Sequence, residues 1–239
     1  MIKPQCGIIL PCGLKPPTIF FSFYRGVFMD SGLKELIGCK KFAILGGTFD
    51  PVHLGHIETA KAIINKMGME KILLLPSGNP PHKDSDSVTD SIHRLNMLKI
   101  AVENDSRLVI STMEIDRGGK TYTVDTIAEL RKVFGNDVEL FFIMGADAIH
   151  YIRTWKSFDR LLKMCSFIAV TRPHYNNRQL KEDADNLIKN YSCRIEIVEI
   201  PAIDVSSSEI RFRIKNGMSV ENMLSDGVIE YINKNGLYK

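Results

Sequence analysis

The chain has 239 residues, 44% of them hydrophobic, with 31 basic and 28 acidic side chains. This length and composition fit one large globular domain or two small ones, and they exclude a disordered or collagen-like chain. The formal charge of +3 resides in residues 1–28, which hold three basic side chains and no acidic one. Residues 29–239 therefore carry as many basic as acidic side chains, and we expect no nucleic-acid partner that binds a broad basic surface.

Residues 1–28 also differ in composition from the rest of the chain, because they hold four of the ten prolines and two of the five cysteines. Pro11 interrupts their apolar run, which is untypical of a signal peptide. No window of the chain approaches the roughly 20 apolar residues that a membrane span needs. We expect a cytoplasmic protein with no membrane partner, in which residues 1–40 are an atypical extension and residues 41–239 form one domain.

Met29 precedes an ordinary helix-like opening, so it is a candidate for the natural translation start. Mass spectrometry of the natural N-terminus tests this hypothesis, and a peptide containing residues 20–25 would contradict it. The five cysteines are an odd number without CxxC spacing, which is untypical of a zinc site or a disulfide framework. We expect reduced thiols, most of them buried.

From residue 41 onward, the pattern alternates between short apolar runs and helical spacing. In chain order it predicts a strand at 42–45, a helix at 57–67, a strand at 71–75, a helix at 92–102 with Ile92, Leu95 and Leu98 facing inward, a strand at 108–111, a helix at 124–134, strands at 139–144 and 167–170, a helix at 178–190, a strand at 195–200, and helices at 207–216 and 220–234. Strands that are apolar throughout are buried on both faces. The alternation therefore predicts a doubly wound α/β fold around a parallel sheet.

The loop after the first strand reads GGTFDPVHLGH over residues 46–56. Ligands of open parallel sheets bind beyond the carboxyl ends of the strands, where this loop lies. Gly46 and Gly47 let backbone amides approach a phosphate, and the following helix start adds partial positive charge. His53 and His56 would share one face of the first helical turn, where two imidazoles with a pKa near 6.5 can donate hydrogen bonds to phosphate oxygens and gain charge as negative charge builds. The alternative is a glycine loop with two capping or core histidines.

Residues 46–56 resemble the GxFxPxHxGH signature of the nucleotidyltransferase superfamily, whose members transfer AMP or CMP from a nucleoside triphosphate to a phosphate. The segment VSSSEIR at residues 205–211 is similar to the superfamily's SSTxIR motif, with serine where threonine is commonest. Serine hydroxyls and amides at a helix start, with Arg211 one turn later, suit a triphosphate. The alternative is a serine N-cap with Glu209 in a capping box.

Residues 53–56 also look like the HIGH signature of class I aminoacyl-tRNA synthetases, but those proteins are longer and no KMSKS-like segment is present here. Further segments separate the subfamilies. They are NPPHK at 79–83, KTYTVDT at 120–126, FIMGAD at 142–147 with Trp155 eight residues later, and TRP at 171–173. Together these motifs fall in the order of bacterial nicotinate mononucleotide adenylyltransferases, and the resemblance covers about residues 41–239. It implies a Rossmann-like nucleotidyltransferase fold in a single domain.

The resemblance implies two half-sites. It assigns ATP to Gly46, Gly47, Thr48, Phe49, His53, His56, Gly145, Asp147, Ser207, Ser208 and Arg211, with His53, His56 and Arg211 as the catalytic residues. It assigns nicotinate mononucleotide to Lys83, Thr123, Trp155 and Arg172. The lone tryptophan can stack on a pyridine ring, and Lys83 or Arg172 suits the substrate phosphate. Structural alternatives are a core Trp155, a solvated Lys83 and an Asp147 that caps the next helix.

The implied reaction belongs to NAD biosynthesis and converts ATP and nicotinate mononucleotide into deamido-NAD and pyrophosphate. Mg²⁺ is expected to arrive with ATP, and no dedicated metal site is expected, because the sequence offers no carboxylate cluster. Two alternatives remain open: a pantetheine-phosphate adenylyltransferase, which shares the first motif, and a non-catalytic nucleotide-binding module. The sequence leaves open the preference for nicotinate over nicotinamide mononucleotide. It also leaves open whether the chain forms a homo-oligomer.

Overall fold

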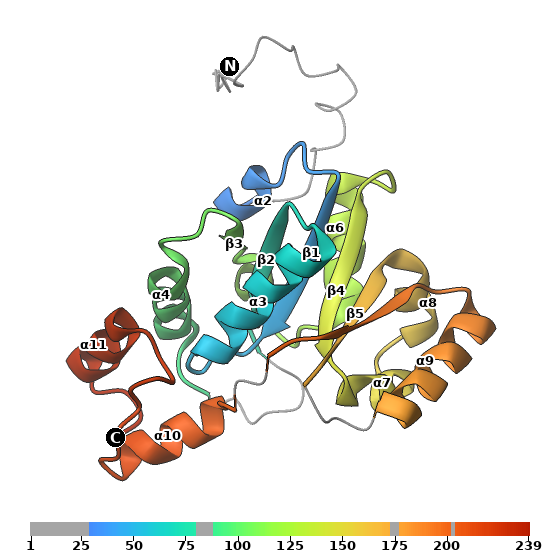
Figure 1. Ribbon diagram of the computed structural model, residues 1–239. Helices are drawn as coiled ribbons and strands as arrows, with labels where there is room; N and C mark the ends of the chain where they lie inside the picture. The colour runs from blue at the N-terminus through green and yellow to red at the C-terminus, as the bar shows by residue number, and fades with distance from the viewer. Residues whose placement is uncertain (1–28, 80–87, 173–176, 202–203) are drawn as a thin grey trace, which may run out of the picture.

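The computed structural model describes residues 29–79, 88–172, 177–201 and 204–239 (Figure 1). A six-stranded sheet forms its centre, and every neighbouring pair of strands is parallel. The strands are β1 (Lys41–Gly47), β2 (Lys71–Pro76), β3 (Leu108–Ile110), β4 (Glu139–Gly145), β5 (Ser166–Thr171) and β6 (Ile195–Glu199). The predicted doubly wound α/β fold is confirmed, and each predicted strand lies within two residues of an observed one.

The order of the strands across the sheet is β3-β2-β1-β4-β5-β6. The chain moves outward from β1 in one direction and then returns to add β4 on the other side of β1. In the register, Ile44 of β1 lies between Leu73 of β2 and Phe142 of β4. The connections therefore diverge beyond the carboxyl ends of β1 and β4, which is the position where sheets of this type bind ligands.

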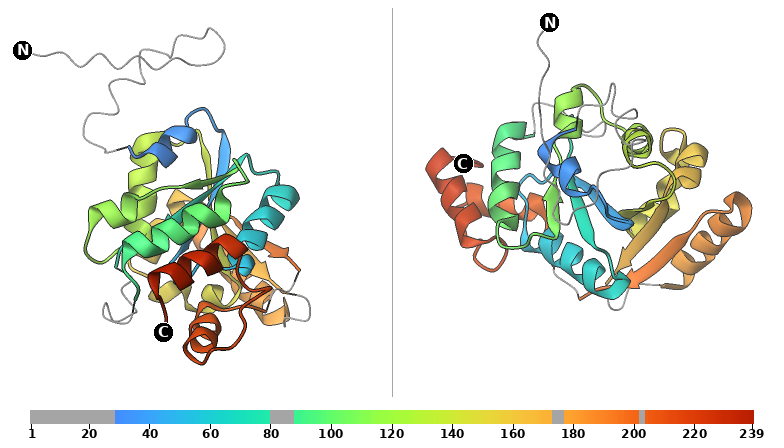
Figure 2. Two further views of the ribbon diagram at one scale, coloured as in Figure 1. Left: turned by 90° about the vertical axis from the view of Figure 1, so that its left-hand side faces the viewer. Right: turned by 90° about the horizontal axis from the view of Figure 1, so that it is seen from above.

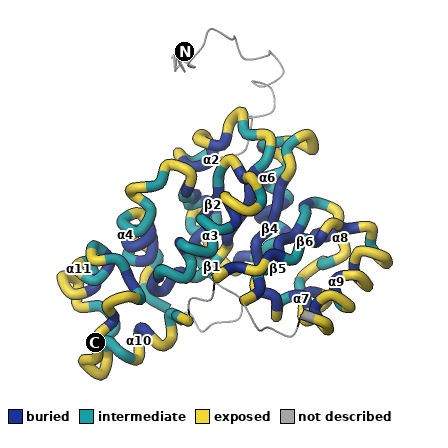
Figure 3. The backbone as a smooth tube through the Cα atoms, viewed as in Figure 1, coloured by how far each residue is buried: buried dark blue, intermediate teal, exposed yellow. Residues whose placement is uncertain are grey.

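Side chains that alternate along the strands divide the interior into two cores. In β1, Phe42 and Ile44 face one core, and Ala43 and Leu45 face the other. The first core is covered by α2 (Ser31–Glu35), α6 (Thr123–Phe134), α7 (Asp147–Tyr151), α8 (Phe158–Met164) and α9 (Asn177–Tyr191), and the second by α3 (Leu54–Met67), α4 (Ser91–Val102), α10 (Ser207–Lys215) and α11 (Asp226–Asn235). Figure 2 shows α11 beside α4, and Figure 3 shows the buried residues concentrated in the strands.

The folded domain begins before the predicted boundary at Lys41. The carboxylate of Asp30 caps α2 by accepting a hydrogen bond from the backbone N–H of Leu33 at 2.8 Å, and its other oxygen accepts one from the N–H of Thr112 at 2.6 Å. Leu33 and Leu36 are fully buried in the first core. Residues 29–40 therefore pack as part of the same domain as residues 41–239, while residues 1–28 lie outside the described residues.

Other differences from the sequence expectations concern short or irregular segments. Ile92 is 55% exposed rather than inward-facing, because it lies in the first turn of α4 on the outer side. The predicted helix at 220–234 starts only at Asp226. Val220 and Leu224 precede it in a non-helical segment, and both are buried. The helix α5 (Met113–Arg117), the 3₁₀ helix η2 (Ile152–Thr154) and α8 were not expected, and α7 was implied only by the alternative that Asp147 caps a helix. They have three to seven residues, too few for a periodic pattern to emerge.

Cys165 and Cys193 are buried and Cys39 is partly buried, all three as free thiols, as expected. Cys6 and Cys12 lie outside the described residues. No helix in the described part of the chain is long and apolar enough to cross a membrane.

Candidate active site

A cavity of about 310 Å³ opens beyond the carboxyl ends of β1, β4 and β5. It lies where the strand order reverses, between β1 and β4. Its walls are formed by Leu45, Gly46, His53, Gly55, His56, Thr59, Ile143, Met144, Gly145, Val170, Arg172, Ile200, Pro201 and Val205. Five of the residues predicted from the sequence for a ligand site are thus brought together: Gly46, His53, His56, Gly145 and Arg172. We call this space the histidine cavity.

Gly145 shows how the cavity wall is kept open. Its backbone does not require glycine, because its φ is not in the left-handed region, and a Cβ atom placed there would meet nothing within 4 Å. The fold alone would therefore accept a side chain at this position. The missing side chain leaves the end of β4 accessible to whatever fills the histidine cavity.

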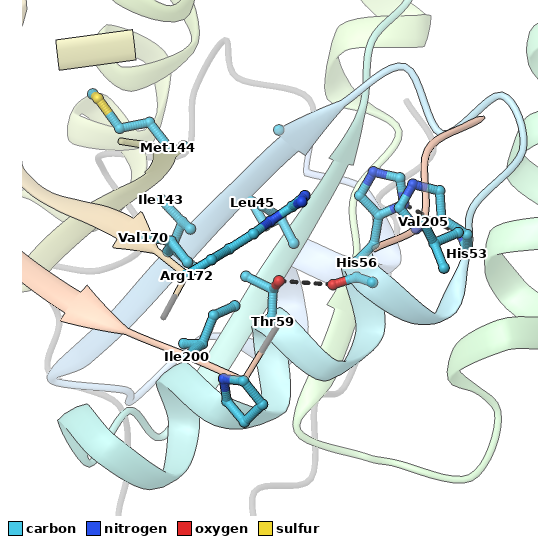
Figure 4. Close-up of a pocket in the computed structure, with 14 residues that line it drawn as sticks. Leu45, His53, His56, Thr59, Ile143, Met144, Val170, Arg172, Ile200 and Val205 are labelled. Atoms are coloured by element: carbon cyan, nitrogen blue, oxygen red, sulfur yellow. Dashed lines mark hydrogen bonds between the residues drawn. The ribbon is translucent and has the colours of Figure 1, made fainter. Parts of the chain in front are cut away.

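The two histidines form a stacked pair at the start of α3. His53 is the extended N-cap residue of the helix, and His56 lies one turn later. Their ring centroids are 3.7 Å apart with an interplanar angle of 23°, and the backbone N–H of His53 donates to Nδ1 of His56 at 3.3 Å. The buried ring of Phe49 packs edge-on against His56 with 4.9 Å between centroids. Figure 4 shows both histidines at one end of the cavity and Arg172 extending across it.

Burial and neighbouring positive charge keep the histidine rings neutral. Burial, with a contribution from the Arg172 guanidinium, lowers the pKa of His53 to about 4. Burial, with a contribution from His53, lowers the pKa of His56 to about 3. Without a ligand, both rings are therefore neutral hydrogen-bonding groups at pH 7 rather than cations. The sequence led us to expect an ordinary pKa near 6.5 for both imidazoles. Their burial makes that expectation wrong.

A buried arginine holds the loop that carries these histidines. Arg94 of α4 is 1% exposed, and it donates to the backbone carbonyl oxygens of Thr48 at 2.7 Å, Thr89 at 2.8 Å and Gly78 at 3.2 Å. One guanidinium thus connects the loop after β1, the segment after β2 and the start of α4. Burial lowers the pKa of Arg94, and the nearby carboxylate of Asp50 opposes that effect. Gly47 and Thr48, predicted to bind ATP, belong to the loop shaped in this way.

The serine and arginine motif of α10 is fastened to the same loop. Ser206 is the N-cap and accepts from the N–H of Glu209 at 3.2 Å. Ser207 donates to the carbonyl oxygen of Pro51 at 2.9 Å, and Arg211 donates to that of Asp50 at 2.7 Å. The described contacts of Glu209 include an ion pair with Arg213 at 2.7 Å.

The helix start of α10 is therefore placed beside the histidine loop. A second guanidinium nitrogen of Arg211 donates to the hydroxyl of Ser208 at 3.3 Å. Ser207, Ser208 and Arg211 adjoin the loop, although they do not line the histidine cavity itself.

The structure contradicts one alternative for Asp147 and the predicted grouping of Arg172. Asp147 is the exposed first residue of α7, whose N-cap is Ala146, so the alternative that Asp147 caps the helix is wrong. Arg172 lines the histidine cavity and lies 3.4 Å from a carboxylate oxygen of Asp204. The structure thus groups Arg172 with the histidines rather than with the other residues predicted for nicotinate mononucleotide. Lys83 lies outside the described residues.

A second cavity, of about 420 Å³, brings Thr123 and Trp155 together at the start of α6. We call it the tryptophan cavity. It is lined by Thr121, Tyr122, Thr123, Val124, Thr154, Trp155, Lys156 and Leu161. The backbone N–H of Thr121 donates to the carbonyl oxygen of Asn79, so Asn79 meets the segment at 120–126 here.

The ring of Phe142 packs near one lining residue of each cavity, although it lines neither of them. It lies 3.7 Å from where a Cβ of Gly46 would be, in the wall of the histidine cavity, and its centroid is 5.9 Å from that of Trp155. Lys156 lines the tryptophan cavity and was missed by the sequence analysis. Its Nζ is 2.9 Å from Asp125 and 4.3 Å from the centroid of Tyr122. In the sequence, the position of Lys156 directly after Trp155 could have indicated that it lies in the same site.

Fold and site define the class of protein. A family model described as "Cytidylyltransferase-like" matches residues 44–213, from β1 through α10. The match spans both the histidine loop and the serine and arginine motif. The chain is thus a nucleotidyltransferase of the cytidylyltransferase-like class, as the two motifs indicated.

Curated relatives narrow the class to one family. A protein of Thermoanaerobacter sp. (strain X514), named "Probable nicotinate-nucleotide adenylyltransferase", is 44% identical over 199 residues, which cover 83% of this chain and 94% of the relative. A protein of Moorella thermoacetica with the same name is 44% identical over 83% of this chain and 92% of its own length. The chain belongs to the nicotinate-nucleotide adenylyltransferase family.

Solved structures agree on the fold. Plasmodium falciparum nicotinic acid mononucleotide adenylyltransferase, complexed with APC in one structure and with NaAD in another, is 24% identical with a TM-score of 0.68. Each alignment covers 83% of this chain and 97% of the solved chain. The single-domain, doubly wound architecture is therefore shared over nearly the whole length of that protein.

Proposed function

We propose that this chain transfers AMP from ATP to nicotinate mononucleotide, giving deamido-NAD and pyrophosphate as a step of NAD biosynthesis. The observation that carries the proposal is the stacked pair of His53 and His56 in a cavity at the strand-order reversal. Family membership supports the choice of substrates, because the curated relatives are named for this activity.

In this proposal the histidine cavity receives the phosphates of ATP. His56 accepts a hydrogen bond at Nδ1, so its neutral ring carries the proton on Nε2 and can donate to a phosphate oxygen. Arg172 crosses the same cavity and supplies a permanent positive charge (Figure 4). A neutral donor and a fixed cation together stabilise an anion without any change of protonation on binding.

The tryptophan cavity receives the nicotinate ring of the acceptor. The indole of Trp155 is held edge-on against Phe142, and because it lines the cavity it can stack on a pyridine ring. Thr123 is the first residue of α6, where backbone amides favour a carboxylate. The acceptor phosphate would then point past Phe142 toward the histidine cavity. Lys83 remains a predicted ligand of the acceptor.

The proposed chemistry is an in-line displacement. An oxygen of the acceptor's 5′-phosphate attacks the α-phosphorus of ATP, the bond from that phosphorus to the bridging oxygen breaks, and pyrophosphate leaves with the electron pair. The nucleophile is already anionic, so no general base is needed. Catalysis is then positioning and charge stabilisation. His56 contacts the α-phosphate, His53 bridges phosphates, and Arg211 neutralises the pyrophosphate with the N–H groups that Asp50 and Ser208 leave unused.

Mg²⁺ is part of the proposal as a companion of ATP. The described residues contain no group of three or more histidine, cysteine, aspartate or glutamate side chains that could hold a metal ion. We therefore assign Mg²⁺ to the phosphate oxygens and to water, where it would offset negative charge. A cytoplasmic location is also proposed, and the free thiols of Cys39, Cys165 and Cys193 support a reducing compartment.

An assay with several acceptors tests the proposed function. The purified chain is incubated with ATP, Mg²⁺ and nicotinate mononucleotide, nicotinamide mononucleotide or 4′-phosphopantetheine, and both pyrophosphate and the dinucleotide product are quantified. The proposal predicts deamido-NAD as the main product, formed with equimolar pyrophosphate. Product with phosphopantetheine alone would favour the pantetheine-phosphate alternative, and the absence of pyrophosphate with every acceptor would favour a non-catalytic module.

A further inference from the structure

The histidine loop contains a buried carboxylate that the chemistry above does not use. Asp50 lies between Phe49 and Pro51 and is 2% exposed. One carboxylate oxygen accepts from the backbone N–H of Thr89 at 3.3 Å. The other accepts from the hydroxyl of Tyr238 at 2.7 Å. Among the described residues, the charged groups facing this pair are Arg94 and Arg211.

Tyr238 comes from the opposite end of the sequence, 188 residues away from Asp50. It follows α11 and packs against the second core. Burial, then the hydrogen bond to Asp50 and the charge of that carboxylate, raise the pKa of the Tyr238 hydroxyl. The hydroxyl therefore stays protonated, and stays a donor to Asp50, at pH 7 and well above it.

Asp50 links Tyr238 to the histidine pair on one side and to Arg211 on the other. Its neighbour Phe49 has a φ of 51°, in the left-handed region, and presses its ring edge against His56. A non-glycine residue keeps this conformation only where surrounding contacts impose it. The backbone carbonyl of Asp50 meanwhile receives the guanidinium of Arg211.

We propose that Tyr238 is a positioning residue for AMP transfer, which holds the His53–His56 pair in place through Asp50. The inference rests on the proposed function, since it assigns Tyr238 to the geometry of that same site. Removal of the hydroxyl leaves a buried carboxylate with one donor fewer, so the loop relaxes and the histidines move. Small displacements of catalytic groups reduce turnover steeply.

Tyr238→Phe tests the proposal, with Tyr231→Phe as the matched control. Tyr231 is another half-buried tyrosine of the C-terminal region, and its hydroxyl contacts His93 and Asn96, each at 3.0 Å, away from the loop. We expect Tyr238→Phe to lower kcat for deamido-NAD at least about fivefold, with KM for ATP changed less than about twofold. Tyr231→Phe should retain the kcat of the wild type.

A readout independent of activity is the pKa of the two histidines, measured by NMR titration of the ligand-free protein. A relaxed loop admits water, so the pKa values of both rings should rise toward 6.5 in Tyr238→Phe and stay low in Tyr231→Phe. Unchanged histidine titration and unchanged kcat in Tyr238→Phe would overturn the proposal, as would an equal loss in both variants. If the wild type forms no dinucleotide, the proposed function fails, and the titration still tests the placement of the loop.

A double-mutant cycle with Asp50→Asn isolates the pathway. If Tyr238 acts through Asp50, adding Tyr238→Phe to Asp50→Asn should reduce kcat much less than Tyr238→Phe does in the wild type. Additive losses would show that Tyr238 acts elsewhere, and would contradict the inference. Melting temperatures measured for all the variants confirm that folded protein is being compared.

Discussion

The backbone N–H of His53 donates a hydrogen bond to Nδ1 of His56 at 3.3 Å, and this contact determines which nitrogen of the neutral His56 ring carries the proton. A neutral imidazole has one N–H, so an accepting Nδ1 leaves the proton on Nε2. The N-cap backbone and the side chain one turn later thereby prepare a donor before any ligand binds. The same local geometry stacks the two rings and buries them, which keeps both neutral.

We predict that His56 is the Nε2–H tautomer at pH 7. Long-range ¹H–¹⁵N NMR spectra of the ligand-free protein distinguish the two tautomers. His150 is an internal comparison, because its Nδ1 faces the carboxylate of Asp183 and should carry the proton there. A protonated Nδ1 on His56 would show that the proposed donor is directed away from the phosphates.

The histidine pair should make stability depend on pH. Both folded pKa values, about 4 for His53 and about 3 for His56, are lower than the unfolded value of about 6.5. As the pH falls below 6.5, the unfolded chain binds protons before the folded one does. The stabilisation is therefore complete above pH 6.5 and is lost progressively toward pH 3.

Urea unfolding at a series of pH values checks this dependence. His56→Gln removes one of the two groups, so its free energy of unfolding should fall less steeply than that of the wild type between pH 6.5 and 4.5. Parallel curves for His56→Gln and the wild type would contradict the low pKa of His56.

Arg94→Met should destabilise the protein by about 3 kcal/mol or more, because it leaves three carbonyl oxygens of half-buried residues without this donor and Asp50 with one nearby cation fewer. Urea midpoints measure the effect. Arg107→Met is the control, since Arg107 pairs only with its near neighbour Asp105 at the surface in the described contacts, and its midpoint should stay close to that of the wild type. A similar midpoint for both variants would refute the role given to Arg94.

Trp155→Ala should raise KM for nicotinate mononucleotide about tenfold or more, the effect expected for one lost aromatic stack, while KM for ATP changes less than about twofold. Trp155→Phe, which keeps an aromatic face, should lose less. Initial rates at varied acceptor and fixed saturating ATP give the two constants separately. An equal rise in both KM values would indicate a general loss of packing against Phe142.

The sequence alone was sufficient for features that depend on local patterns. The apolar runs located every strand of the described sheet, and the spacing of His53 and His56 placed them together at the start of α3, His53 as the N-cap and His56 in the first turn. The sequence resemblance also indicated that the chain is a nucleotidyltransferase, because the histidine loop and the α10 motif each lie within one short segment of the sequence.

Features that depend on distant parts of the chain were not predictable in this way. Arg94 looks like a surface residue of an amphipathic helix until the strand order brings the carbonyl of Thr48 beside it. Tyr238 has no local signal at all, since its partner Asp50 is 188 residues away. Arg172 was grouped with the acceptor residues, although the carboxyl end of β5 opens toward the histidines.

The turnover of His56→Ala tests the central claim most directly, with His150→Ala as a control for loss of an exposed histidine. The measured quantity is kcat for deamido-NAD formation from ATP and nicotinate mononucleotide at saturating Mg²⁺. The account predicts a loss of about 10²-fold or more in His56→Ala, as expected when one donor to the developing charge is removed, and no loss in His150→Ala. Wild-type kcat in a folded His56→Ala protein would contradict the claim that the stacked histidine pair is needed to catalyse AMP transfer.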